Sequence, residues 1–284
     1  MSEGILHRLT AFSNDPQGGN PAGVWVGEQL PDTREMQQIA AEVGYSETVF
    51  VTPSQGAQRI VRYYSPEAEV TFCGHATIAA GVVLGRSEGD GSYTFSTRAG
   101  DVTVTARTLN GRTESSLVSV ATRHEEVSEA LLKDVLRTLD WNRSDLSSAI
   151  PPVRAYAGAW HLVLAVAESD RLALLDYDFE SLKQVMLDAG LTTLQLVWQE
   201  RPDLFHSRNP FPVGGVVEDP ATGAAAAALG GYLRDAGLIT TPCRFAIRQG
   251  ETMGRPSDLT VDVPASGGVM VSGSAVELHE PHAA

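Results

Sequence analysis

An amphipathic helix is the first element that the hydrophobic pattern predicts. Apolar side chains recur at helical spacing over residues 36–43. Asp32 followed by Glu35 has the spacing of a capping box, which begins a helix. Gly44 stands where a C′ glycine would end that helix, and the β-branched and aromatic residues of 47–51 then predict a short strand.

The same helix–strand pattern returns in the second half of the chain. Apolar side chains recur at helical spacing over 182–189, Gly190 ends the pattern, and a strand is predicted at 194–197. Gly190 lies 146 residues after Gly44 (190 − 44). A pattern that repeats at a fixed spacing indicates an internal duplication.

The spacing of 146 residues also aligns other features of the two halves. Each half is expected to run in the order helix, strand, arginine-containing strand and small-residue helix. Residue identity across the pairs is low, so coincidence is the alternative explanation. The aligned pairs are Arg62 with Arg208, Cys73 with Asp219, Thr77 with Gly223, and Ala79-Ala80 with Ala225-Ala226.

Two segments, 78–84 and 224–231, carry almost no polar side chains. A helix that is apolar on all sides is buried, and its small residues let other backbone approach closely. We therefore expect each segment to be a central helix that a sheet wraps around. An ordinary core helix of an α/β domain is the alternative.

The repeat also predicts the domain organisation. An N-terminal lobe is expected over residues 1–115 and a C-terminal lobe over 116–266, with the crossover within 113–129. Strand-like alternation of apolar and polar residues continues near the C-terminus. We expect a last strand within 267–280 to return to the N-terminal lobe.

Composition narrows the classes of partner. A net charge of −14 argues against general affinity for nucleic acid or for an anionic membrane, because both require a basic surface. Surface acidity that serves solubility is the simple explanation, and a small anionic substrate needs only a locally positive pocket. The sequence shows no apolar run long enough to span a bilayer and no signal peptide. With only two cysteines, far apart in sequence, we expect a cytoplasmic protein.

Both small-residue helices begin with residues that suit anion binding. Gly74 to Thr77 and Thr222 to Ala224 place small residues at the two N-termini. Backbone N–H groups at a helix N-terminus lack partners within the helix and attract anions. If the two ends face one another, they could hold one substrate carboxylate and stabilise developing negative charge.

The titratable residues differ between the aligned halves, as distinct roles in one cleft would require. Glu47 aligns with Thr193 and stands at the head of an apolar strand, where partial burial suits an acid/base catalyst. A solvent-exposed charge at a strand end is the alternative. His75 is either a substrate-binding or a structural histidine, and Asp219 is either catalytic or the N-cap before Pro220.

Cys73 is either an activated thiolate at a helix N-terminus or a buried, inert thiol. The histidines lack an HxxxH pair and the sequence lacks CxxC, so no metal site is expected. The phosphate-binding patterns GxxxxGK[ST] and GxGxxG after a strand are also missing.

Five motifs, in order along the chain, resemble those of the phenazine-biosynthesis PhzF-like proteins. Together they span nearly the whole sequence, and as a set they are highly specific to that family. They are the run 12–24 that contains Asn20-Pro-Ala-Gly, Ser46-Glu-Thr-Val-Phe50, Cys73-Gly-His-Ala-Thr77, Glu218-Asp-Pro-Ala-Thr-Gly223, and Gln249-Gly250 with Gly254-Arg-Pro-Ser257.

The resemblance implies the diaminopimelate-epimerase-like α+β fold: two pseudo-symmetric lobes, each a curled sheet or barrel around a small-residue helix. It implies an active site between the lobes, a homodimer, a biosynthetic role and no cofactor. Carried over by position, Glu47 is similar to the family's acid/base in an allylic isomerisation, and His75 and Asp219 are similar to its active-site pair. The substrate-binding positions that the resemblance implies are Asn20, Ser46, Cys73, Gly74, Gly223 and Ala224.

Two departures from related patterns affect the expected reaction. Ala224 stands where the phenazine-making members have serine, so a hydroxyl contact with substrate is missing. The related racemases use two opposed cysteines, whereas here Cys73 aligns with Asp219. We therefore expect a cofactor-independent isomerase that moves a proton on a small carboxylate-containing metabolite. An epimerase with unlike bases and a non-catalytic binding protein are the alternatives.

Overall fold

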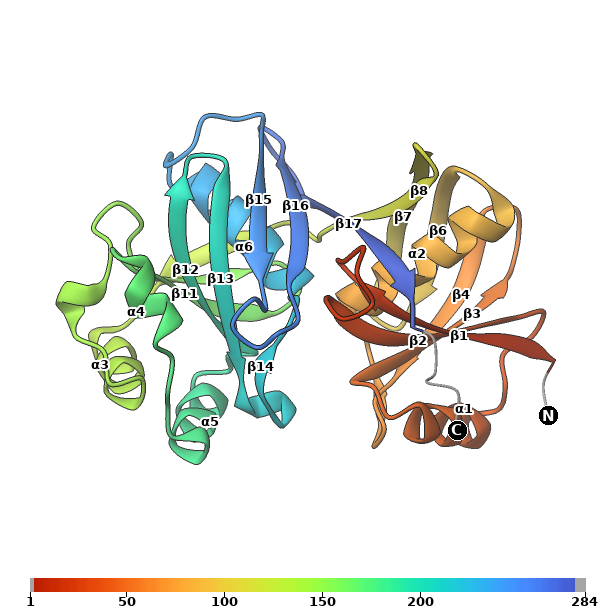
Figure 1. Ribbon diagram of the computed structural model, residues 1–284, viewed down its shortest axis with the longest axis horizontal. Helices are drawn as coiled ribbons and strands as arrows, with labels where there is room; N and C mark the ends of the chain where they lie inside the picture. Colours follow the sequence, from red (N-terminus) through yellow and green to blue (C-terminus); the bar gives the residue numbers. More distant parts are fainter. Residues whose placement is uncertain (1–2, 279–284) are drawn as a thin grey trace. The chain divides into compact units, whose positions relative to one another are not determined.

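The computed structural model describes residues 3–278, so residues 279–280 of the expected C-terminal strand lie outside the described part. The chain forms two compact units (Figure 1), and each is described by itself. Of the described residues, unit 1 holds 3–118 and 272–278, and unit 2 holds 119–271. Of the expected crossover, 113–118 and 123–126 are strands, and 119–122 connect them.

Unit 1 contains two helices and most of its strands before residue 119, and one late strand returns to it. Its elements are β1 (Gly4–Ala11), β2 (Asn20–Gly27), α1 (Thr33–Val43), β3 (Glu47–Pro53), β4 (Gln58–Tyr64), β5 (Glu69–Val70), α2 (Gly74–Glu88), β6 (Gly91–Thr97), β7 (Gly100–Leu109), β8 (Arg112–Val118) and β17 (Met270–Glu277).

The strands of unit 1 close into a barrel around α2. Pairing runs β8–β17–β1–β2–β3–β4–β6–β7 and returns to β8, with the β2–β3 and β4–β6 pairs parallel. Inside, α2 packs against β1, β2, β3, β7 and β8, and residues 75–85 of the helix are all buried. The expected central helix of the first half is therefore confirmed.

Unit 2 has the same kind of arrangement, with two further α-helices and two short 3-10 helices among its described residues. Its elements are β9 (Arg123–Glu126), α3 (Glu129–Thr138), the 3-10 helix η1 (Arg143–Asp145), β10 (Val153–Tyr156), β11 (Trp160–Ala165), α4 (Ser169–Ala173), α5 (Phe179–Asp188), β12 (Thr193–Arg201), β13 (Leu204–Phe211), the 3-10 helix η2 (Pro212–Gly214), β14 (Val216–Asp219), α6 (Gly223–Asp235), β15 (Cys243–Gln249) and β16 (Ser257–Val263).

A curled sheet surrounds α6 in unit 2. Its strands pair in the order β9–β10–β11–β12–β13–β15–β16, and β14 pairs with β13. Strands from both ends of this order, β9 and β16, pack against α6, and the apolar side chains of α3 and α5 form a separate core with β11 and β12. The α+β class expected from the sequence is confirmed in both units.

Local sequence signals set the ends of α1 as expected. The side chain of Asp32 accepts a hydrogen bond of 2.9 Å from the backbone N–H of Glu35. Gly44 has φ of 69°, the left-handed conformation that glycine adopts at low cost. The strand that follows begins at Glu47, so this carboxylate stands at the start of β3.

The two halves keep the spacing of 146 residues in their paired strands, but not at the starts of their small-residue helices. Phe50 pairs with Arg62 across β3 and β4, and residues 146 positions later, Leu196 and Arg208, pair across β12 and β13. However, α2 begins at Gly74 and α6 at Gly223, a spacing of 149 residues (223 − 74).

The constant alignment was therefore wrong at the helix N-termini. From Arg208 to the start of α6 the chain runs 15 residues (223 − 208), three more than the 12 from Arg62 to the start of α2 (74 − 62), and β14 lies where the other half has the two-residue β5. Cys73, the N-cap of α2, corresponds to Thr222, the N-cap of α6, and not to Asp219. His75 corresponds by the same spacing to Ala224.

At Gly81 the surrounding barrel leaves α2 no room for a side chain. A Cβ atom built there would lie 2.0 Å from Oγ of Ser115 and 2.7 Å from Cγ1 of Val104. We expect Gly81→Ala to lower the free energy of unfolding by about 1–3 kcal/mol through overpacking. Gly74→Ala in the same helix meets no atom within 4 Å and is the control for urea denaturation. Equal stability of the two variants would contradict the packing argument.

Unit 2 buries a row of polar side chains on one face of its sheet. Nδ1 of His161 lies 2.8 Å from Oγ1 of Thr193, and Nδ2 of Asn209 donates to the same hydroxyl at 3.3 Å. Ser207 donates to Asn209 at 2.7 Å. Within the described residues, Nε2 of His161 and Oε1 of Gln195 are buried without a hydrogen-bond partner. Burial keeps the imidazole neutral and lowers the pKa of His161 to about 3.

The neutral state of His161 predicts a pH-dependent stability. Because the folded-state pKa lies below the usual 6.5, the unfolded chain binds the additional proton, and stability is lost as pH falls from 6.5 toward 3. The loss from this group is expected to reach about 2 kcal/mol at pH 5. His161→Gln should remove this part of the dependence in urea denaturation at pH 7.5 and pH 5. Identical pH dependence in both proteins would count against the prediction.

Candidate active site

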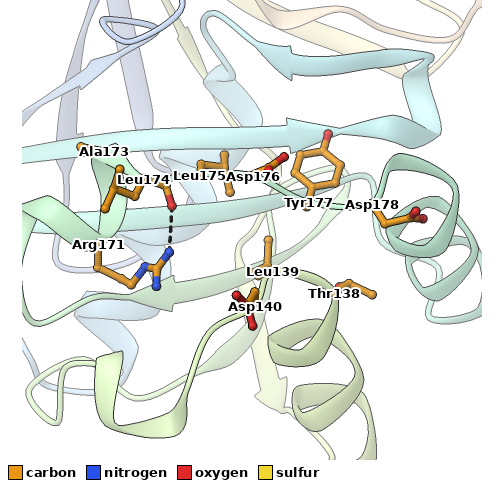
Figure 2. A pocket seen from close by; sticks show the side chains of 10 residues that line it. All are labelled: Thr138, Leu139, Asp140, Arg171, Ala173, Leu174, Leu175, Asp176, Tyr177 and Asp178. Atoms are coloured by element: carbon orange, nitrogen blue, oxygen red, sulfur yellow. Dashed lines mark hydrogen bonds between the residues drawn. The ribbon is translucent and has the colours of Figure 1, made fainter.

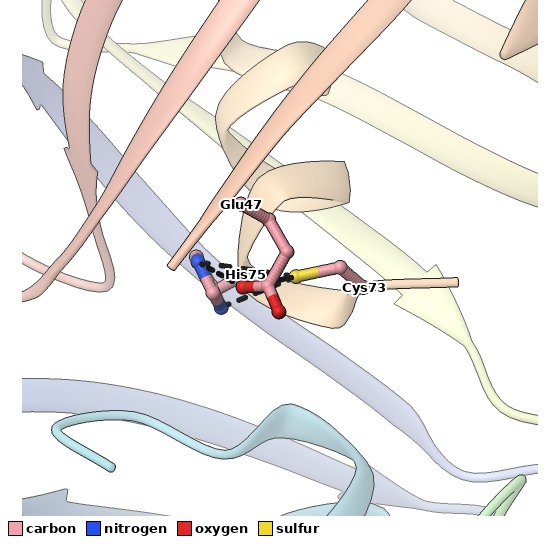
Figure 3. A group of neighbouring side chains, drawn as sticks. All are labelled: Glu47, Cys73 and His75. Atoms are coloured by element: carbon pink, nitrogen blue, oxygen red, sulfur yellow. Dashed lines mark hydrogen bonds and ion pairs between the residues drawn. The ribbon is translucent and has the colours of Figure 1, made fainter. Parts of the chain in front are cut away.

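The structure brings together three of the residues that the sequence singled out. Glu47 begins β3, Cys73 is the N-cap of α2, and His75 lies in the first turn of that helix. Sγ of Cys73 donates to Oε2 of Glu47 at 3.4 Å, and Nε2 of His75 lies 3.5 Å from the same oxygen. Figure 3 shows the three side chains pointing toward one another at the start of α2. We call them the Glu–Cys–His cluster.

Burial differs among the three side chains. Cys73 is 8% exposed and His75 is 7% exposed, whereas the side chain of Glu47 keeps 21% of its surface accessible. The carboxylate is therefore the member of the cluster that solvent reaches most easily. The thiol and the imidazole lie behind it and contact it, which suits a carboxylate that must meet a substrate.

Besides Cys73, whose Sγ lies 3.3 Å from Nδ1, and Glu47, two neighbours outside the cluster contact the imidazole of His75. Nδ2 of Asn20, the first residue of β2, lies 3.2 Å from Nδ1, and Oγ of Ser46 lies 3.4 Å from Nε2. Because the amide nitrogen of Asn20 donates, Nδ1 accepts, and the ring proton of a neutral imidazole is on Nε2. That N–H then faces the carboxylate of Glu47 and the hydroxyl of Ser46.

The N-terminus of α2 adds a backbone contribution to the cluster. The side chain of Cys73 makes no capping hydrogen bond, so it leaves N–H groups of the first turn for another acceptor. A Cβ atom on Gly74 would meet nothing within 4 Å, so the space next to this backbone is open. The helix dipole favours negative charge at this end.

In unit 2, Asp219 does not cap a helix as the local sequence suggested. It is the last residue of β14, Pro220 lies outside the helix, and the N-cap of α6 is Thr222. Oγ1 of Thr222 donates to Oδ2 of Asp219 at 2.5 Å. The carboxylate of Asp219 is therefore held next to the start of α6, and Gly223 and Ala224 form the first two residues of that helix.

Gln249 is a residue near the second helix that sequence reasoning did not single out. Its Nε2 donates to the backbone carbonyl of Asp219 at 2.7 Å, and its Oε1 accepts from the backbone N–H of Thr222 at 3.2 Å. The side chain is 1% exposed. The motif Gln249-Gly250 marked this residue in the sequence. A glutamine side chain can bond to many backbone groups, so the motif does not reveal that it holds the turn after β14.

A cavity of about 680 Å³ lies elsewhere in unit 2 (Figure 2). Asp140, Asp176 and Asp178 contribute carboxylates to its lining, and Arg171 donates to the carbonyl of Leu174 at 2.9 Å. None of the site residues expected from the sequence lines this cavity. We assign the candidate chemistry to the Glu–Cys–His cluster and not to this cavity.

Within residues 3–278, none of the helices combines the length and the apolar character that crossing a membrane requires. The expected pairing of the two helix N-termini around one substrate, the homodimer and the cytoplasmic location all stay predictions from the sequence.

Two units of this architecture, each with a sheet curled around a small-residue helix, define the diaminopimelate-epimerase-like α+β class. Residues 9–280 match the sequence profile of the phenazine biosynthesis-like proteins, PhzC-PhzF. The chain belongs to this family, as its motifs indicated.

Curated relatives of the same class align with this chain over nearly their whole length. The chain is 29% identical to the uncharacterized isomerase YfhB of Bacillus subtilis, over 97% of both chains. It is 31% identical to an uncharacterized isomerase of Deinococcus radiodurans, over 96% of this chain and 92% of that one. The expected enzyme class, an isomerase, is the class of these relatives.

Solved structures share the fold. A phenazine biosynthesis protein of the PhzF family from Bacillus anthracis superposes with a TM-score of 0.85 at 24% identity, over 98% of each chain. A hydroxyproline epimerase from Agrobacterium vitis superposes with a TM-score of 0.66 at 13% identity, over 96% of this chain and 90% of that one. At these identities the similarity concerns the fold alone.

Proposed function

We propose that this chain is a cofactor-independent isomerase that moves a proton between two carbons of a small carboxylate-containing metabolite. The observation that carries the proposal is the Glu–Cys–His cluster at the N-terminus of α2. A partly accessible carboxylate stands there against two buried groups that hydrogen-bond to it or lie within ion-pair distance. General acid/base catalysis requires such a positioned group.

In the proposed reaction, Glu47 removes a proton from a carbon next to an unsaturated or carbonyl group. The resulting anion is delocalised, and the backbone N–H groups at the start of α2 stabilise it. Glu47 then returns the proton to another carbon of the same delocalised system. His75 and Cys73 hold the carboxylate in place through the contacts at 3.5 Å and 3.4 Å.

The remaining expected site residues enter the proposal as binding groups. Ser46 and Gly74 lie beside the cluster in sequence and would contact the substrate. Asp219, Gly223 and Ala224 belong to unit 2, and their participation in the same reaction rests on the family resemblance. A cytoplasmic homodimer of biosynthetic function is part of the same proposal.

An epimerase with unlike bases is the second candidate, and the geometry limits it. Epimerisation needs one group to remove a proton from one face of a carbon and another group to deliver a proton to the opposite face. Cys73 and Glu47 contact one another at 3.4 Å. Neighbouring groups approach a substrate from the same side, so this pair favours a proton shift on one face over inversion.

Exchange with heavy water tests the proposal. The chain is incubated with a panel of small unsaturated and α-substituted carboxylates in heavy water, and products are followed by NMR. We expect deuterium in a product whose double bond or carbonyl has moved. Inversion at the exchanging carbon would instead support the epimerase. Thermal stabilisation by a carboxylate that shows no exchange would overturn the proposal in favour of a binding protein.

A further inference from the structure

We propose that Glu47, Cys73 and His75 also form a binding site for a thiophilic divalent cation such as Zn²⁺, and that the bound cation blocks catalysis. The three residues offer a carboxylate oxygen, a thiol sulfur and an imidazole nitrogen, all within 4.8 Å of one another. These are the donor atoms that zinc prefers in proteins. The sequence patterns HxxxH and CxxC do not detect this set, because Glu47 comes from β3, 26 residues before Cys73, and only Cys73 and His75 lie together at the start of α2.

The separations of the donor atoms fit a tetrahedral cation. Bonds of about 2.3 Å to sulfur and about 2.0 Å to nitrogen and oxygen, at tetrahedral angles, place the ligand atoms about 3.3–3.6 Å apart. In the structure, Oε2 of Glu47 lies 3.4 Å from Sγ of Cys73 and 3.5 Å from Nε2 of His75. Sγ lies 3.8 Å from the same nitrogen. A cation can therefore enter with shifts of a few tenths of an ångström.

Charge and protons balance when the cation binds. The thiol of Cys73 releases its proton to solvent, and the thiolate and the carboxylate of Glu47 together neutralise the two positive charges. His75 coordinates through Nε2, so its proton moves to Nδ1, where the side-chain amide of Asn20 lies at 3.2 Å. A half-turn of that amide presents its carbonyl as the acceptor.

Three protein ligands leave the fourth tetrahedral position open. Zinc sites with an open position bind water or substrate there, whereas structural zinc sites have four protein ligands. Glu47 keeps 21% of its side chain exposed, so solvent reaches the cluster on the side of this carboxylate. A cation can enter from this side without unfolding the barrel.

Inhibition by the cation rests on the proposed function, whereas its binding does not. A coordinated carboxylate oxygen no longer accepts a proton from a carbon. The cation would therefore remove Glu47 from the reaction, and a chelator would restore turnover. The site would make the enzyme sensitive to free zinc.

Cobalt titration of the metal-free protein tests binding directly. Co²⁺ is added to the wild type, and the sulfur-to-cobalt charge-transfer absorption in the near ultraviolet is recorded. We expect absorption that saturates at one equivalent and disappears when Zn²⁺ is added. Cys73→Ser should abolish it. Cys243→Ser is the matched control, because Cys243 is the other free thiol and belongs to unit 2, and it should leave the absorption unchanged.

Two further variants keep the test independent of any fold defect in Cys73→Ser. Glu47→Gln and His75→Gln keep the thiol but each remove one ligand of the cation. Each should lower the affinity for Zn²⁺ by more than the roughly 10–100-fold that the loss of a residue hydrogen-bonded to a ligand costs. The proposed site would be excluded if the wild type showed no sulfur-to-cobalt absorption, or if only Cys243→Ser lost this absorption. Cobalt binding without inhibition of exchange by Zn²⁺ would overturn the inhibitory role and leave both the site and the proposed isomerase intact.

Discussion

Glu47→Gln is expected to lower turnover by about 10²–10⁴-fold, the usual contribution of a positioned acid/base group. Glutamine keeps the shape of the side chain and can still accept a hydrogen bond from the thiol of Cys73, but it cannot take up a proton at neutral pH. Affinity for the substrate is therefore expected to change much less than turnover. Both quantities are measured with a substrate identified by exchange in heavy water.

Glu69→Gln is the matched control for this variant. Glu69 belongs to the same unit and its side chain is 19% exposed, close to the 21% of Glu47. It pairs with Arg62 and Arg98 and is outside the Glu–Cys–His cluster. We expect its replacement to leave turnover unchanged. Wild-type turnover in Glu47→Gln would exclude Glu47 as the acid/base, and an equal loss in both variants would indicate a general effect of charge.

The sequence predicted the local features of the site well. Capping by Asp32 and the stop at Gly44 depend on neighbours in the chain, and both occur as expected. They fix where β3 begins and thus where Glu47 stands. The motif that contains Cys73 and His75 begins a helix that carries almost no polar side chains over residues 78–84, and this part of the helix is buried. The family resemblance, and not these local signals, named Glu47 and His75 as catalytic and Cys73 as substrate-binding; only the structure brings the three side chains into one cluster.

The second helix end was predicted less well, because its geometry depends on distant residues. Asp219 followed by Pro220 has the local pattern of a helix start, yet the helix begins at Gly223. Gln249 holds the intervening turn from 30 residues away. A local capping rule cannot include such a partner, and an alignment without gaps cannot include the three additional residues between Arg208 and the start of α6.

Glu218→Gln is expected to lower the free energy of unfolding by about 3–5 kcal/mol, the cost of breaking a buried ion pair by removing one partner. Arg208 donates to the carboxylate of Glu218 through two nitrogens, and the two side chains are only 12% and 6% exposed. Glutamine leaves the guanidinium without a counter-charge in a site that water hardly reaches. Urea denaturation measures the loss.

An exposed ion pair that is also held by two hydrogen bonds provides the control. Arg143 also donates through two nitrogens to Glu129, but these side chains are 64% and 76% exposed. Water screens such a pair, so Glu129→Gln is expected to leave stability nearly unchanged. A large loss in both variants would show that burial does not determine the effect.

The ion pair also connects stability to the candidate chemistry, because Glu218 precedes Asp219 in β14. Replacing both partners, as Arg208→Met with Glu218→Leu, removes the buried charges together and should restore much of the stability. If Asp219 participates in the reaction, activity in this double variant depends on whether β14 keeps its pairing with β13. Recovery of stability without recovery of turnover would indicate that the pair positions Asp219. Failure to recover stability would contradict the assignment of the loss to an unpaired charge.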